Sequence, residues 1–160
     1  MSSEAREGEG GKGNNVAKDR FKAHISVYLF LEKENKILLY LRQNSGFADG
    51  YYSLVSGHLE KDETITNAMV REAKEEAGIT IDPQEMQVLH VMHSLYDKEY
   101  VNIFFHCKKW HGEITNLEPT KCGELKFFEK DNLPKNTLSY VKTALKKSNS
   151  GIIYSETGWE

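Results

Sequence analysis

This chain has little cysteine, no long hydrophobic run and no excess of basic residues. Its two cysteines, Cys107 and Cys122, lie outside any CxxC spacing, which argues against a disulfide framework and favours a reducing compartment such as the cytoplasm. Because no stretch of roughly 18 apolar residues occurs, we expect no membrane-spanning helix and no membrane partner. The net charge of −3 and the pI near 6.1 argue against binding a nucleic-acid polymer. A small anionic substrate is compatible with this charge, since bound cations can supply the local positive charge.

The composition is that of one globular domain. Of the 160 residues, 39% are hydrophobic and 28% are charged, and this length is enough for a sizeable core. Residues 1–18 are rich in Gly, Glu and Ser and are expected to be a disordered tail. Residues 19–160 are expected to form a single domain whose apolar last ten residues dock back onto it.

Hydrophobic patterning predicts strands on both sides of a central helix. Strands are expected at 24–31, 36–41, 51–56, 86–95, 101–110 and 125–129, with a second helix at 138–147. The central helix carries an apolar stripe of Met69, Val70, Ala73 and Ala77 and ends at Gly78. This order predicts a layered α/β or α+β domain.

The side of the central helix next to this apolar stripe is acidic. Glu72, Glu75 and Glu76 fall at i, i+3 and i+4 and therefore project together, over roughly 100° of arc. Arg71 lies one turn before Glu75 and can pair with it. Clustered carboxylates suit a hard divalent cation, Mg²⁺ or Mn²⁺, although a Glu-rich helix on its own is more often just a solvated face.

A longer pattern argues against that simpler reading. The residues from Gly57 to Ile79 read GHLEKDETITNAMVREAKEEAGI, which contains G-x5-E-x7-R-E-x2-E-E-x-G. This pattern resembles the box of the Nudix hydrolases, with Ala73 where the family carries a bulkier apolar residue. The chain before the box reads LVSG, where many members have a Pro-Gly-Gly turn.

The resemblance implies an α/β/α sandwich around a mixed β-sheet and hydrolysis of a nucleoside diphosphate linked to another group. It implies catalytic roles for Glu72 and Glu75, which are both retained as candidates for the general base, with Arg71 orienting a carboxylate. Glu63 would lie behind the metal ligands and help to orient them. The implied metal ligands are the Gly57 carbonyl and the side chains of Glu72, Glu75, Glu76 and Glu118, with Glu124 as the alternative to Glu118.

The resemblance also implies substrate contacts outside the box. Arg42, at the end of a strand, matches a substrate-binding arginine of the MutT-type enzymes. Tyr52, Tyr96 and Asn136 fall near positions that line substrate pockets in family members. A nucleoside triphosphate, normal or oxidised, is the expected substrate, and a diadenosine polyphosphate is the alternative suggested by Tyr96.

Other readings place the chain outside the hydrolases. A nucleotide-binding module without catalysis would be expected to lose a box glutamate, and all are present here. The isopentenyl-diphosphate isomerases share the fold but would need Cys107 or Cys122 to face the metal. A structural domain that dimerises through its apolar C-terminal segment is the remaining alternative, and a homodimer is compatible with any of these readings.

Overall fold

The computed structural model describes residues 18–160, so the expected tail lies outside the described residues except for Lys18. Within this range the chain forms two α-helices and eight strands. The strands are β1 (His24–Lys33), β2 (Lys36–Arg42), β3 (Tyr52–Ser53), β4 (Val55–His58), β5 (Met86–Leu95), β6 (Glu99–Cys107), β7 (Cys122–Glu129) and β8 (Tyr154–Thr157). The helices are α1 (Ile65–Ala77) and α2 (Ser139–Asn149), and a short 3-10 turn, η1 (Pro83–Glu85), precedes β5.

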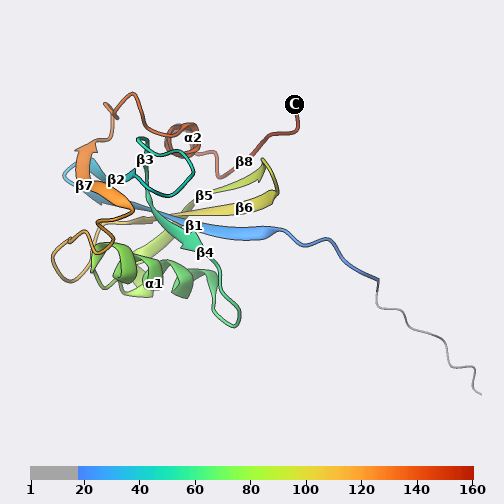
Figure 1. The fold of residues 1–160 in the computed structure, drawn as a ribbon, viewed down its shortest axis with the longest axis horizontal. Helices are drawn as coiled ribbons and strands as arrows, with labels where there is room; N and C mark the ends of the chain where they lie inside the picture. Colours follow the sequence, from blue (N-terminus) through green and yellow to red (C-terminus); the bar gives the residue numbers. More distant parts are fainter. Residues whose placement is uncertain (1–17) are drawn as a thin grey trace, which may run out of the picture.

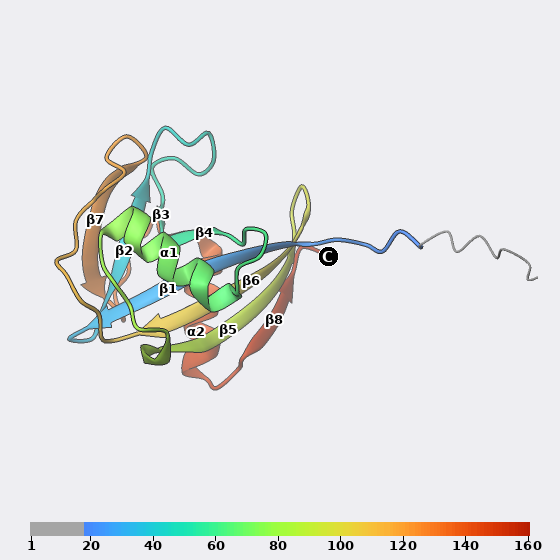
Figure 2. The same ribbon diagram turned by 90° about the horizontal axis from the view of Figure 1, so that it is seen from below.

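The strands form one mixed sheet in the order β3-β2-β1-β6-β5-β8, with β4 pairing with β1 and β7 pairing with β2. The pairs β1–β6 and β5–β8 are parallel, and the other pairs are antiparallel. Helix α1 covers one face of this sheet and α2 covers the other (Figures 1 and 2). The expected α/β/α sandwich around a mixed sheet is confirmed.

Strand β1 separates two cores by alternation of its side chains. Val27, Leu29 and Leu31 pack on the α1 side, where the buried helix residues are Ala68, Met69, Ala73 and Ala77. Phe30 packs on the α2 side with Phe104 of β6 and with Val141, Ala144 and Leu145 of α2. The small alanines of α1 let its backbone approach the sheet closely, which brings its acidic edge next to β4.

Helix α1 begins and ends where its residues favour it. The Thr64 hydroxyl accepts a 3.1 Å hydrogen bond from the Asn67 N–H at the N-terminus. Gly78 adopts φ +69° at the C-terminus, where its N–H donates to the Lys74 carbonyl.

The site is placed by the way in which β2 and β4 share one edge of β1. Strand β4 pairs with β1 over Ser26–Leu29, and β2 pairs with it only at Glu32–Lys33. Beyond this hairpin, β2 leaves β1 and pairs with β7 along its whole length. The space between the diverging strands opens toward the acidic side of α1.

Some boundaries differ from the prediction. The strand expected at 51–56 is two strands, β3 and β4, and Gly57 lies within β4, paired with Val27. The strand expected at 101–110 ends at Cys107. Trp110 lies outside the strand and packs against Phe127, with the two ring centroids 6.2 Å apart.

The C-terminal residues lie against β5. Strand β8 runs parallel to β5, and the fully buried His90 of β5 contacts the C-terminal segment through both ring nitrogens. The His90 Nδ1 is 2.9 Å from the Ile152 carbonyl, and its Nε2 is 2.7 Å from the Ser155 hydroxyl. Because the carbonyl can only accept, Nδ1 carries a proton and donates it. No helix in the described part of the chain is long and apolar enough to cross a bilayer.

Candidate active site

The central feature is a cavity of about 550 Å³ between α1, β2, β4 and the turn before β7. Its walls combine carboxylates with a few cations and hydroxyls. The lining residues are Tyr40, Arg42, Asn44, Ser45, Ser56, Gly57, His58, Glu60, Arg71, Glu72, Glu75, Glu76, Glu118 and Lys121. The structure therefore brings Glu118 together with the three helix glutamates, although it is more than forty residues away along the chain.

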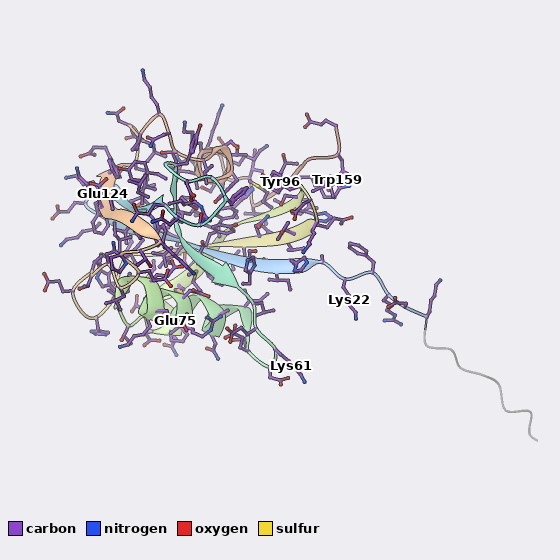
Figure 3. The ribbon with its side chains drawn as sticks, viewed as in Figure 1. Lys22, Lys61, Glu75, Tyr96, Glu124 and Trp159 are labelled. Carbon is purple, nitrogen blue, oxygen red and sulfur yellow. The ribbon has the colours of Figure 1, made fainter. Side chains whose placement is uncertain are left out.

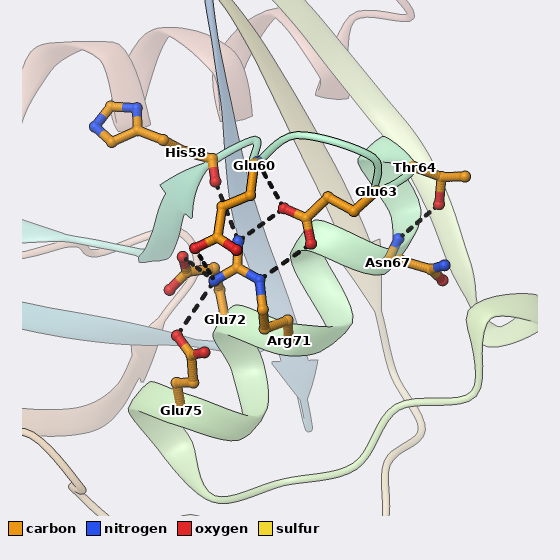
Figure 4. A network of polar contacts seen from close by, with 8 residues as sticks. All are labelled: His58, Glu60, Glu63, Thr64, Asn67, Arg71, Glu72 and Glu75. Carbon is orange, nitrogen blue, oxygen red and sulfur yellow. Dashed lines mark hydrogen bonds and ion pairs between the residues drawn. The ribbon is translucent and has the colours of Figure 1, made fainter.

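Arg71 organises the acidic edge of α1 (Figure 4). Its guanidinium donates to both carboxylate oxygens of Glu63, at 3.1 and 2.9 Å, and to Glu72 at 2.8 Å. It also donates to the His58 carbonyl at 3.1 Å and to Glu75 at 3.3 Å. Several donors in a rigid fork suit this task, which the ammonium of a lysine could not perform.

Glu63 lies behind Arg71 and outside the cavity lining of the described residues. Its carboxylate also accepts a 2.7 Å hydrogen bond from the Glu60 N–H, which closes the loop before α1. The hydrogen bonds from Arg71 come first among the causes that lower the pKa of Glu63. Glu63 therefore positions Arg71, and through it the Glu72 carboxylate.

Gly57 is required for space and not for an unusual backbone angle. A Cβ at this position would overlap the side chain of Glu72. The glycine in β4 thus lets a helix carboxylate approach the strand backbone.

Burial and like charge raise the pKa of the inner carboxyls. Burial is the largest cause for Glu76, whose pKa is raised to about 9, with further contributions from Glu72 and Glu118 and a single opposing hydrogen bond from the Ser56 N–H at 3.1 Å. Burial also raises the pKa of Glu72, against the stabilising contact with Arg71. A bound cation would favour the ionised form of these carboxyls and offset the repulsion between them.

Glu118 is held by its own set of contacts. The Tyr40 hydroxyl donates to its carboxylate at 3.2 Å, and its N–H donates to the Asn116 side chain at 3.1 Å. Glu124, the alternative, instead accepts a hydrogen bond from the Tyr52 hydroxyl and lies outside the described cavity lining.

The donor set fits a hard divalent cation in its chemistry, because it consists of carboxylate and carbonyl oxygens around a buried, crowded carboxyl. As the side chains are arranged in residues 18–160, no three His, Cys, Asp or Glu groups converge on one point that could hold a metal ion. Glu72 and Glu75 turn toward Arg71. Rotation of these side chains away from the guanidinium would be needed for them to coordinate an ion together.

The residues expected to contact substrate fall in different places. Arg42 lines the cavity, donates to the Phe47 carbonyl at 2.9 Å and lies over the Phe47 ring. Tyr52 is buried against Phe128 in the core of the α2 side.

Tyr96 and Asn136 also lie outside the described cavity lining. Tyr96 is exposed at the β5–β6 turn, well separated from Glu75 of α1 and from Glu124 (Figure 3). Asn136 donates to the Gly50 carbonyl at 2.8 Å.

The two cysteines are buried free thiols. Cys107 donates to the Lys109 carbonyl and Cys122 to the Glu124 carbonyl. Neither belongs to the described cavity lining, so the placement that the isomerase reading requires is not observed.

Sequence reasoning missed several lining residues. Tyr40 could have been found from its spacing, because it lies two residues before Arg42 and shares a face of β2 with it. Lys121, Asn44 and Ser45 lie in loops, where no periodic pattern points to them.

Comparison with known proteins agrees with this geometry. The family model of the NUDIX domain matches residues 21–146. The chain belongs to the Nudix hydrolase family. The match covers all of the elements that line the cavity of this Nudix domain and ends before the last residues of α2 and before β8.

Named relatives differ in what they act on. An ADP-ribose pyrophosphatase of Methanocaldococcus jannaschii is 34% identical over 137 residues, which is 82% of this chain and 78% of the relative. An 8-oxo-dGTP diphosphatase of Proteus vulgaris is 31% identical over 61% of this chain and 86% of the relative. The crystal structure of a MutT Nudix hydrolase from Burkholderia pseudomallei has a TM-score of 0.72 at 22% identity, covering 79% of this chain and 98% of that one, and supports the fold alone.

Proposed function

We propose that this Nudix protein hydrolyses the diphosphate linkage of a nucleoside triphosphate, normal or oxidised, with Mg²⁺ or Mn²⁺ as cofactor. The observation that carries the proposal is the composition of the cavity, in which Glu72, Glu75, Glu76 and Glu118 face the same space as Arg42 and Lys121. An anionic substrate would need this combination, since carboxylates alone repel it and cations alone would not recruit a metal.

The residues divide the work by position. The Gly57 carbonyl and the four glutamates would hold the metal, which when bound neutralises phosphate oxygens and lowers the pKa of water. Glu72 and Glu75 are the two groups that could accept the proton of the attacking water. Arg71, fixed by Glu63, positions Glu72, and Arg42 would contact the substrate from β2. Tyr96 and Asn136 would be reached only by a substrate that extends beyond the cavity.

ADP-ribose is the second candidate substrate. It is favoured by the relative from M. jannaschii, whose match spans most of both chains. The only feature that favours a diadenosine polyphosphate as substrate is Tyr96. A cytoplasmic location is part of the proposal and fits the two buried free thiols.

The test is a chromatographic assay of the nucleotide products formed with Mg²⁺ from normal and oxidised nucleoside triphosphates, ADP-ribose, diadenosine polyphosphates and nucleotide sugars. Wild type would be compared with Glu75→Gln, which leaves an exposed side chain of the same shape. We expect the rate on one substrate class to fall by about 100-fold to 10,000-fold, the usual contribution of a group that handles a proton. Glu85→Gln, an exposed change in η1 outside the described cavity lining, serves as the matched control and should retain full activity.

Each contrary outcome has its own meaning. Turnover that persists in excess chelator would exclude the metal mechanism. Near-normal turnover by Glu75→Gln would remove Glu75 from the catalytic group. If no substrate is cleaved although nucleotides still bind, the protein is a nucleotide-binding module.

A further inference from the structure

The cations of the cavity are not equally available. Arg71 is occupied by Glu63, Glu72 and the His58 carbonyl. Arg42 donates to the Phe47 carbonyl and to the Ser45 hydroxyl, 3.1 Å away. In this arrangement, both guanidinium groups therefore donate hydrogen bonds to other residues of the protein.

Lys121 differs from both. Within residues 18–160 its ammonium forms no ion pair and donates no side-chain hydrogen bond, although the cavity that it lines is rich in carboxylates. Its exposed stem can follow a ligand at the cavity wall without first breaking a contact among these residues. An ammonium in this situation is a strongly hydrated point charge that suits a phosphate oxygen.

The backbone of Lys121 is nevertheless held in place. Its N–H donates to the Glu118 carbonyl and its carbonyl accepts from the Gln43 N–H, both at 2.9 Å. The side chains of Gln43 and Asn44 also donate to the Pro119 and Thr120 carbonyls, at 2.8 and 2.9 Å. These bonds tie the turn at residues 118–121 to the end of β2.

This turn presents two opposite charges to one cavity. Glu118 points to Tyr40 and the helix glutamates, and Lys121 lies three residues further along the same turn. If a metal bound by the glutamates holds the phosphate chain, the two phosphates that flank the cleaved bond would lie at the acidic wall. A third phosphate would bring additional negative charge and need a cation outside that wall.

We propose that Lys121 binds a phosphate that does not flank the cleaved bond, and that it thereby makes the protein select nucleoside triphosphates over substrates with two phosphates. This inference rests on the proposed function, because it assumes that the cavity binds the phosphate chain. It identifies Lys121 as a specificity-determining residue.

The test measures binding separately from turnover. Titration calorimetry with Mg²⁺ would compare a nucleoside diphosphate with the triphosphate of the same base, both with an imido group in place of the oxygen between the first two phosphates. We expect wild type to bind the triphosphate analogue about fivefold to tenfold more tightly, as one charge-assisted hydrogen bond allows. Lys121→Met should reduce this ratio to about one, and Lys121→Arg should retain most of it.

Lys126→Met is the matched control. Lys126 lies on β7, with its ammonium 5.3 Å from the centre of the Phe128 ring, and is outside the described cavity lining. Its replacement should leave the ratio unchanged.

Two results would overturn the proposal: no preference in wild type, or a ratio that is unchanged in Lys121→Met, whether or not both ligands lose affinity equally. Hydrolysis of the natural triphosphate is assayed in parallel. A wild type that shows the binding preference without turnover would defeat the proposed hydrolase and leave the role of Lys121 standing.

Discussion

Two clusters of charged residues in this protein place a glutamate side chain in opposite electrostatic environments. In the cavity, the Glu76 carboxyl has Glu72 and Glu118 as neighbours, and a single backbone N–H is donated to it. At the far end of β1, Glu32 is a single carboxylate that contacts Lys130 at 2.8 Å, Lys108 at 3.3 Å and His106 at 3.5 Å.

The pKa shifts follow from these neighbours. Burial raises the pKa of Glu76 to about 9, and the nearby carboxylates add to the shift. Burial acts in the same direction on Glu32, but the hydrogen bonds from Lys130 and Lys108 outweigh it, and the pKa of Glu32 is lowered. The shift at Glu76 opposes folding of the ionised protein, and the shift at Glu32 favours it.

The comparison shows which cluster stabilises the fold and which one does not. The contacts of Glu32 join the end of β1 to the residues that follow β6 and β7, and they are complete without a ligand. The cavity cluster is left with more negative charge than its own residues compensate, as expected of a site that is completed by a cation.

Among the changes that test this comparison of the two clusters, the largest expected effect comes from Gly57→Ala, which disturbs the cavity cluster without changing its charge. The added methyl would overlap the Glu72 side chain and displace it, so we expect the hydrolysis rate to fall by about 10-fold to 100-fold, as for other changes that disturb metal-ligand placement. The measurement is kcat/KM at saturating Mg²⁺, with the Tm recorded in parallel. A full rate would show that the position of Glu72 against β4 is not needed.

A smaller effect, on stability, is expected from Glu76→Gln. The amide keeps the shape of the side chain and an oxygen that can accept from the Ser56 N–H, and it is neutral without having to take up a proton on folding. Since the raised pKa of Glu76 costs stability at pH 7, the metal-free variant should be more stable by about 1–3 kcal/mol in urea unfolding with chelator present. Glu75→Gln, at a side chain that is 54% exposed, is the control and should change little. A lower stability of Glu76→Gln would contradict the inference that the raised pKa of Glu76 destabilises the folded protein.

The smallest effect, of opposite sign, is expected from Glu32→Gln, which should destabilise by about 1–2 kcal/mol at pH 7. A lowered pKa contributes stability that is present above the unfolded value, 4.5, and is lost as the pH falls through the lower folded value. The difference between wild type and variant in urea unfolding should therefore narrow as the pH drops below 4.5.

Glu129→Gln is the control for Glu32→Gln. Its partner Lys36 lies 3.8 Å away in an exposed pair, so a loss below about 0.5 kcal/mol is expected. A difference for Glu32→Gln that does not change with pH would show that packing, and not charge, accounts for the loss.

Much of the helix-borne part of the site could be predicted from the sequence. Glu72, Glu75 and Glu76 share a side of α1 because the period of a helix determines which residues lie together, and the apolar stripe determines which side faces the sheet. Arg71 was predicted to pair with Glu75, but its shortest contacts are with Glu72 and Glu63. The contact with Glu63 depends on the loop before α1, whose path has no period.

The sequence by itself determined the family, the layered fold and the acidic side of α1, because these depend on local periodicity and on a long fixed pattern. Only the tertiary structure placed Glu118 in the cavity and Glu124 beside Tyr52, since the two acids are six residues apart in one segment and differ only in where that segment turns. It also placed Gly57 within a strand and Lys121 at the cavity wall. The physical reason is that contacts between loops and strands distant in the chain depend on how β2 and β4 part from β1, which no local pattern encodes.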